Sequence, residues 1–313
     1  MQDWSCDQIE TFDTLAEIYT IYGYIVKGIQ MLIFTYVILF LLLQRFRGRN
    51  QIKDISMLIA VLSLLNSVFC IVRINTLFPF YVNNELLGSI FALENIGYFG
   101  ATWLFGIKYY ETAIDFEQMI LGDPAYFQTY DSIVKTMTRK RRFNLLRWSM
   151  FVFMCVLCIF TGVSMFNDAT VQGMVDLASY SLLSIVVAGI AIAMAAAFLK
   201  FYRIVARMQD KPDFNCCYIV TQIAGMSVFV IAWTLAGISL CIHKGTLSDF
   251  PLQRNLMICA IVGFTSNLLV FQIIAIVIYK SSIVAGKDRS SEVGGESNNI
   301  ILHEIKGQYD LER

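Results

Sequence analysis

The sequence predicts an all-α membrane protein: a bundle of seven transmembrane helices with the N-terminus outside the cytosol and the C-terminus in the cytosol. Three observations predict this class. Hydrophobic residues make up 57% of the 313 residues and charged residues only 15%. A soluble chain has about 45–50% hydrophobic and about 25% charged residues. The hydrophobic residues gather in seven segments. Lys and Arg, in turn, fall mostly on one side of the alternating crossings.

Each segment meets or approaches the length of about 20 apolar residues that a helix needs to cross the hydrocarbon core of a bilayer. In chain order they are 18–43, 55–77, 86–107, 145–166, 171–199, 214–241 and 256–279. The runs 214–242 and 255–279 contain no charged residue, so they cannot be amphipathic surface helices of a soluble protein. We therefore expect a short extracytosolic N-terminus (1–17), a seven-helix domain (18–280) and a flexible cytosolic tail (281–313), which is rich in Ser and Gly.

Lys and Arg predict the orientation, because cytoplasmic loops carry an excess of both. The first, third and fifth connections and the tail hold four, six, four and five of them. The opposite side holds only Arg73, Lys244 and Arg254. A bias of nineteen to three, kept through every crossing, indicates an odd number of spans. The acidic N-terminus then lies outside.

The longest connection, 108–142, is predicted to be cytosolic. Its first part, 109–121, continues the third helix until Pro124, because proline cannot continue a helix and restricts the residue before it. Its second part ends in a basic cluster, which consists of Arg139, Lys140, Arg141 and Arg142. This cluster is either a positive-inside topology signal or a docking site for anionic lipid, which attracts each basic residue by about 1 kcal/mol.

Several kinds of chemistry lack their motifs in this sequence. The two histidines, His243 and His303, lie outside the span cores, so there are no paired haem ligands there and no His-Glu-x-x-His zinc helix. Neither the Gly-x-Ser-x-Gly nucleophile turn nor the Gly-x-x-x-x-Gly-Lys-Ser/Thr phosphate loop occurs. We therefore expect a protein that is not an enzyme, with no catalytic residue, no metal, no cofactor and no nucleic-acid partner.

Four charged residues within the spans form the candidate site: Lys27, Arg73, Glu94 and Asp176. Such residues are costly in a membrane and usually face the bundle interior with a partner. Lys27 and Glu94 lie roughly 12–14 Å below the outer ends of their helices, at a rise of about 1.5 Å per residue. Arg73 and Asp176 lie nearer the outer surface. The four are either ion pairs that fix helix packing or the lining of an outward-opening cavity for a small polar or zwitterionic ligand.

Further polar and aromatic side chains in the spans are candidates for the walls of such a cavity. They are Asn95, Tyr98, Trp103, Tyr180, Gln222, Trp233, Asn267 and Gln272. Each is equally explained as a packing contact between helices, where polar side chains form interhelical hydrogen bonds. Both interpretations of the candidate site therefore stay open.

The predicted topology resembles that of seven-span receptors, which have an outer N-terminus, short outer loops, basic inner loops and a polar inner tail. The motifs of the largest receptor family differ. At the end of the third span that family has Asp/Glu-Arg-Tyr, whereas this sequence has Gly106-Ile107-Lys108-Tyr109. The seventh span here reads Asn267-Leu268-Leu269-Val270-Phe271, without the proline of that family. The resemblance is therefore one of architecture, and it assigns no family.

Three functions are compatible with this topology. The first is a receptor-like protein that senses a small ligand in the outer half of the bundle and signals to a cytosolic partner. The second is a solute transporter or channel subunit. All four prolines are predicted to lie in loops, whereas many secondary transporters have spans interrupted by Gly or Pro. The third is a non-catalytic membrane scaffold. In each case the chain is a multi-pass protein in a lipid bilayer, and we favour the plasma membrane over an endomembrane.

Overall fold

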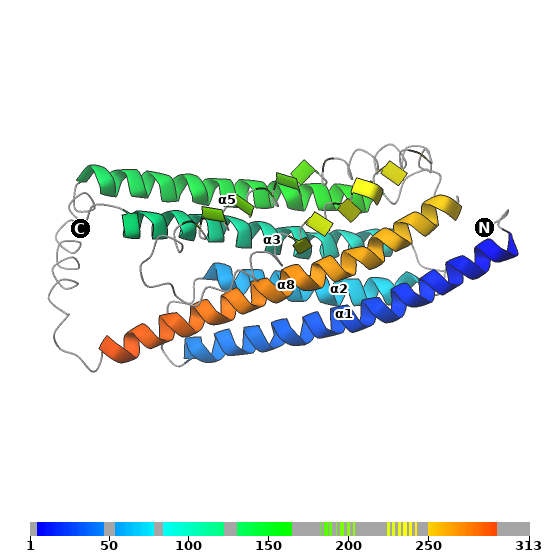
Figure 1. Cartoon of the computed structure of the whole chain (residues 1–313), viewed down its shortest axis with the longest axis horizontal. Coiled ribbons are helices and arrows are strands. Elements are labelled where there is room, and N and C mark those ends of the chain that lie inside the picture. Colours follow the sequence, from blue (N-terminus) through cyan, green and yellow to red (C-terminus); the bar gives the residue numbers. More distant parts are fainter. Residues whose placement is uncertain are drawn as a thin grey trace.

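Figure 1 shows the computed structural model of the chain, in which long helices lie side by side. The structure describes residues 5–46, 54–77, 84–121, 130–164 and 250–292, together with individual residues within 182–203 and 224–242. The helices described from end to end are α1 (Cys6–Phe46), α2 (Asp54–Leu77), α3 (Asn84–Leu121), α5 (Tyr130–Ser164) and α8 (Phe250–Glu292). Every described residue except Ser5 is α-helical.

These five helices are long and apolar enough to cross a membrane. The shortest, α2, has 24 residues, and about 20 are needed for the hydrocarbon core. The chain is therefore an all-α integral membrane protein. The predicted spans 171–199 and 214–241 fall on parts that the structure describes only at individual positions. The positions described there, such as Ile185 and Ala232, are helical.

The C-terminal ends of two helices extend well beyond the apolar segments. α3 continues through 109–121, as predicted, and ends at Leu121. α8 continues past Tyr279 to Glu292, so the first residues of the predicted tail are helical. The remainder of that tail, 293–313, lies outside the described residues.

Two helix starts have a local explanation in the sequence. The Ser5 backbone N–H donates to Gln8 Oε1 at 3.0 Å, and the Gln8 backbone N–H lies 3.4 Å from Ser5 Oγ. This reciprocal pair is a capping box, and it starts α1 well before the apolar segment at residue 18. Pro251, which we predicted to lie in a loop, is in the first turn of α8. Proline is tolerated there because the first helical N–H groups have no partner within the helix.

The helices alternate in direction. α1, α3 and α8 run one way and α2 and α5 run the other way (Figure 1). In space α5 packs on α3, α3 on α2, α2 on α1 and α1 on α8, while α8 also touches α2. The two ends of the described chain are thus brought together. Of the apolar stretch of α3, 83% is buried, compared with 22% of that of α5, so α3 is the central helix.

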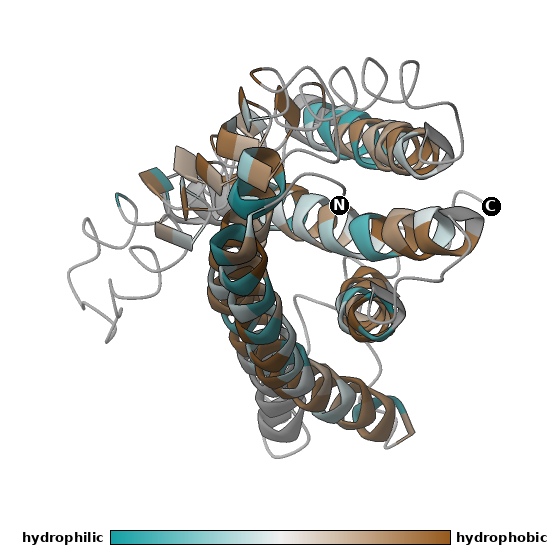
Figure 2. Ribbon diagram, turned by 90° about the vertical axis from the view of Figure 1, so that its right-hand side faces the viewer, coloured by the Kyte–Doolittle hydropathy of each residue, from teal (hydrophilic) through white to brown (hydrophobic). Residues whose placement is uncertain are grey.

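The bundle combines buried charged and polar side chains with an exposed apolar surface, which a soluble protein avoids. Lys27, Gln30, Asn66, Glu94 and Arg147 are all buried, none more than 9% exposed. The outer face of α1 is apolar and between 42% and 69% exposed at Ile18, Ile21, Ile25, Ile29 and Leu32. Figure 2 shows brown, hydrophobic residues along the described helices. Lipid is as apolar as these side chains, so exposing them in a bilayer costs little, whereas exposing them in water would be unfavourable.

Glycines allow the closest approaches between helices. A Cβ atom added to Gly97 of α3 would lie 2.7 Å from both the Asn66 backbone N and the Leu62 backbone O of α2. A Cβ atom on Gly162 of α5 would lie 2.6 Å from the Gly88 backbone O of α3. Small residues have this role in membrane proteins, where association depends on close backbone packing. The contacts between α2 and α3 and between α3 and α5 therefore each require a glycine.

Aromatic rings fill the contact between α1 and α8. Tyr19 lies 5.1 Å from Phe264, and Phe34 lies 5.7 Å from Phe271 in an edge-to-face arrangement, both measured between ring centroids. Nearer the C-terminal ends of the two helices, the Tyr279 ring of α8 lies 4.7 Å from a phenylalanine ring of α1. Such pairs contribute about 0.5–1.5 kcal/mol each beyond the apolar area they bury. They hold the last described helix against the first.

Candidate ligand-binding cavity

A cavity of about 320 Å³ lies among α1, α2, α3, α8 and the described residues Ala232 and Ala236. A volume near 300 Å³ is at the small end of the range for ligand sites in proteins. The lining includes Arg73, in the last turns of α2, and Gln253, in the first turn of α8. α1, α3 and α8 all begin at this end of the bundle (Figure 1), which is the predicted outer end.

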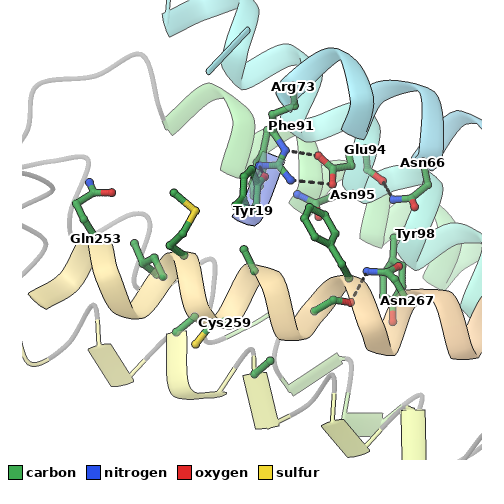
Figure 3. Close-up of a pocket in the computed structure, with 17 residues that line it drawn as sticks. Tyr19, Asn66, Arg73, Phe91, Glu94, Asn95, Tyr98, Gln253, Cys259 and Asn267 are labelled. Atoms are coloured by element: carbon green, nitrogen blue, oxygen red, sulfur yellow. Dashed lines mark hydrogen bonds and ion pairs between the residues drawn. The ribbon is translucent and has the colours of Figure 1, made fainter. Parts of the chain in front are cut away.

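A buried ion pair forms one wall of the cavity. Arg73 of α2 contacts Glu94 of α3 through two hydrogen bonds: Nε lies 2.5 Å from Oε2, and NH2 lies 3.2 Å from Oε1. The side chains are only 16% and 11% exposed. Arg73 NH1 also donates to the Tyr19 hydroxyl of α1 at 2.6 Å. Figure 3 shows the paired guanidinium and carboxylate beside Tyr19. Two-point contact of this kind fixes orientation as well as distance.

A second polar group lies behind this wall and centres on Asn66 of α2. Lys27 Nζ donates to Asn66 Oδ1 at 2.8 Å and to Gln30 Oε1 at 3.2 Å. Asn66 Nδ2 donates to the Glu94 backbone O at 3.0 Å. Because a carbonyl can only accept, this last bond fixes which end of the Asn66 amide faces Lys27. Asn66 therefore connects the lysine of α1 to the acid-bearing turn of α3.

Lys27 lies in an unusual environment for a cation. It is 1% exposed, and its two hydrogen-bond acceptors are neutral amide oxygens. The ring centroids of Phe264 and Phe271 in α8 each lie 6.0 Å from Lys27 Nζ. The described ion pairs join other residues. Lys27 is thus held by amide dipoles and aromatic faces rather than by a carboxylate.

Two asparagines of the cavity wall carry buried polar atoms with no hydrogen-bond partner among the described residues: Asn95 Nδ2 on α3 and Asn267 Oδ1 on α8. Asn95 is 7% exposed. Asn267 Nδ2 donates to the Gly263 backbone O at 3.2 Å. This bond fixes the orientation of the amide, so the atom of Asn267 without a partner is the acceptor Oδ1. Each unpartnered buried polar group costs about 1–3 kcal/mol. Two such groups in the cavity wall therefore lower the stability of the ligand-free fold.

The structure brings three of the four predicted charged residues into one polar network. Arg73 contacts Glu94 directly, and Lys27 is connected to Glu94 through Asn66. Asp176 lies outside the described residues. Of the other candidates, Asn95, Tyr98 and Asn267 line the cavity. Trp103 is buried elsewhere, where its Nε1 donates to the Arg147 backbone O at 3.0 Å, and Tyr180, Gln222 and Trp233 lie outside the described residues.

Sequence reasoning missed Tyr19, Gln30 and Asn66. A signal for them was present, because residues that are three, four or seven apart share one face of a helix. Gln30 is three residues from Lys27, and Asn66 is seven residues from Arg73. A search for polar side chains on the same face as each buried charge would have found both residues.

A second ion pair connects the C-terminal part of α3 to α5. Arg147 NH2 lies 2.5 Å from Glu111 Oε2, and Arg147 NH1 donates to Asn144 Oδ1 at 2.8 Å. The two side chains of the pair are 5% and 21% exposed. The basic cluster Arg139, Lys140, Arg141 and Arg142 begins two turns earlier in α5, where the last three side chains are exposed. The central helix therefore lines the cavity at one end and, at the other, contacts Arg147 in the part of α5 that follows the basic cluster.

Glu111→Gln is expected to lower the free energy of unfolding by about 1.5 kcal/mol, because the buried Arg147 loses a charge-assisted hydrogen bond. Unfolding in mixed detergent micelles measures this loss. Glu10→Gln on the exposed start of α1 is the control and should change little. Equal stability of the two variants would contradict a structural role for the pair.

The comparisons with known proteins assign no family. No protein-family model matches the chain, and a search of curated proteins finds no significant match. Inferences about function therefore rest on the fold and on the cavity.

Proposed function

We propose that the chain is a receptor-like seven-span membrane protein that senses a small ligand in the outer half of its bundle and signals to a cytosolic partner. The observation that carries this proposal is the cavity near the end where α1, α3 and α8 begin, with two atoms in its wall, Asn95 Nδ2 and Asn267 Oδ1, that have no hydrogen-bond partner among the described residues. A cavity with few but well-placed polar atoms in a mainly apolar wall is typical of small-molecule sites.

The proposed topology has seven crossings with the N-terminus outside. Its support is the direction of the helices: α5 ends at the end of the bundle where α8 begins (Figure 1). The chain must therefore cross an even number of times between them, and the predicted spans 171–199 and 214–241 supply two crossings. The basic residues in the last turn of α1 and in the first half of α5 support a cytosolic location for the opposite end.

The proposed signal passes along α3. This helix lines the cavity with Glu94 and Asn95, continues to Leu121 and contacts α5 through Glu111. Its 38 residues extend over about 57 Å at 1.5 Å each, which is longer than the hydrocarbon core of about 30 Å. A ligand that favours one packing of α3 against α8 thereby changes the inner end of α3, in proportion to its difference in affinity for the two packings.

The basic cluster of α5 is the proposed docking surface for the cytosolic partner. Lys140, Arg141 and Arg142 are exposed, and they lie close in sequence to Arg147, the residue that contacts α3. A partner with an acidic surface would be attracted to this cluster and would respond to movement of α3.

Two measurements on the same protein test the function against its alternatives. In cells, a proximity-labelling enzyme fused to the C-terminus reports recruitment of cytosolic proteins during exposure to a panel of small aromatic amides, amines and carboxylates. In proteoliposomes, uptake of the same compounds reports transport. We expect at least one compound to change recruitment in the wild type and not in Asn95→Leu, with no uptake. Uptake without recruitment would indicate a transporter, and neither response would indicate a scaffold.

A further inference from the structure

The charge balance of the cavity wall bears on the class of ligand. Arg73 and Glu94 are the charged residues of the described lining, and they bind each other at two points. The positive charge is further engaged by the Tyr19 hydroxyl. A carboxylate or ammonium ligand would have to compete with this pair and lose its own hydration in a site that is mainly apolar. The wall therefore favours a molecule without charged groups.

The unpartnered atoms define what the polar end of the ligand must provide. Asn95 Nδ2 is a donor, so it needs an acceptor, and Asn267 Oδ1 is an acceptor, so it needs a donor. The first is on α3 and the second on α8. Figure 3 shows both side chains among the residues that line the pocket. A group that carries both functions, such as a carboxamide, satisfies the two helices at once.

The rest of the wall defines the body of the ligand. Phe91 and Phe264 contribute aromatic rings, and Ala232, Ala236 and Ala260 contribute only methyl groups. Rings beside small side chains leave room for a flat apolar group, which stacks offset or edge-to-face on the phenylalanines. A cavity of about 320 Å³ holds a single-ring molecule with a short polar end.

We infer that this cavity binds a neutral aromatic molecule that ends in a carboxamide or a similar group able to donate and to accept a hydrogen bond. The inference rests on the proposed function, because it names the ligand class of the same site. It differs from the zwitterionic ligand that the four charged residues suggested on their own. The ligand bridges α3 to α8, which also meet beside the cavity through the edge-to-face rings of Tyr98 and Phe271, with centroids 5.6 Å apart.

Three probes of nearly the same shape test the class: phenylacetamide, phenylacetate and phenethylammonium. The full chain is purified in detergent, and the melting temperature is measured as each probe is titrated. We expect phenylacetamide to raise the melting temperature in a saturable manner, because a ligand that binds only the folded state stabilises it. The two charged probes should give a much smaller shift at equal concentration.

Substitution of the asparagines identifies the site. Asn95→Leu and Asn267→Leu should each weaken phenylacetamide binding roughly five- to tenfold, the effect of one lost neutral hydrogen bond. Without ligand, Asn95→Leu should melt at the same temperature as the wild type or higher, because Asn95 Nδ2 has no described partner to lose. Asn75→Leu is the matched control at the same end of the bundle. Asn75 Nδ2 donates to the Ile71 backbone O, and Asn75 Oδ1 accepts from the Tyr24 hydroxyl of α1, both outside the cavity. Asn75→Leu should therefore lower the melting temperature without ligand but leave probe affinity unchanged.

Three outcomes would overturn the ligand class: equal or larger shifts with a charged probe, a phenylacetamide shift that Asn95→Leu leaves intact, or a large loss of ligand-free stability in Asn95→Leu. The proposed function is judged separately by recruitment in cells. Recruitment in response to a charged compound would keep the function and reject the neutral ligand. Phenylacetamide binding without any recruitment would keep the ligand class and reject signalling.

Discussion

Glu94→Gln is expected to lower the free energy of unfolding by about 3–5 kcal/mol, the typical cost of removing one partner from a buried ion pair. The substitution keeps the size of the side chain and removes only its charge. Arg73 would then remain buried with one uncharged oxygen in place of the carboxylate that it contacts at 2.5 Å and 3.2 Å. The loss should appear as unfolding at lower denaturant in mixed micelles, and as a weaker ligand response.

The double variant Arg73→Met/Glu94→Leu separates charge from packing. Replacing both members of a buried pair by apolar residues of similar volume is often neutral or stabilising, so the double variant should recover most of the lost stability. The Tyr19 hydroxyl loses a donor in this variant, which limits the recovery. If Glu94→Gln were as stable as the wild type, the ion pair would contribute nothing to the stability of the fold. Burial of the charged residues around it would then need a different explanation.

Gly97→Ala is expected to destabilise the bundle by about 3 kcal/mol, at the upper end of the usual cost of overpacking. The added methyl group would lie 2.7 Å from two backbone atoms of α2, the nitrogen of Asn66 and the oxygen of Leu62. A flexible side chain could move aside, but a helix backbone cannot move without separating α2 from α3. Asn66 would move with its backbone, so the hydrogen bond from its Nδ2 to the Glu94 backbone O should be lost as well.

Gly28→Ala is the matched control for this prediction. A Cβ atom on Gly28 of α1 would meet no atom within 4 Å. Alanine has a higher helix propensity than glycine by about 1 kcal/mol, so this variant should be as stable as the wild type or slightly more stable. Thermal unfolding of both variants in the same detergent provides the comparison. A Gly97→Ala protein as stable as Gly28→Ala would show that α2 and α3 are not in close backbone contact.

The five helices that the structure describes from end to end could be predicted from sequence, because apolar segments of this length have few alternatives to crossing a membrane. Their ends could not, because outside the hydrocarbon core a helix depends on local contacts. The capping box of Ser5 and Gln8 starts α1 before its apolar segment. α5 begins at Tyr130, within a polar stretch that we assigned to a connection.

The members of the polar network could be predicted better than their pairing. Desolvation requires buried charges to find partners, which is why Lys27, Arg73 and Glu94 were candidates. Which residues pair depends on the rotation of each helix about its axis. Glu94 is closer in predicted depth to Lys27, yet it contacts Arg73, and Lys27 contacts the amide of Asn66. Depth along a helix was available from the sequence, and rotation was not.

The most direct test of a bundle whose two ends face different compartments is the labelling of single cysteines with a membrane-impermeant thiol reagent. One protein retains only the native Cys6, which is exposed at the start of α1. The other carries Arg141→Cys, at an exposed position of α5, in a background without other cysteines. Cys6 should react in intact cells, and the cysteine at position 141 only after permeabilisation. Reaction of both cysteines from the same side would contradict the proposed topology and the outward-facing cavity.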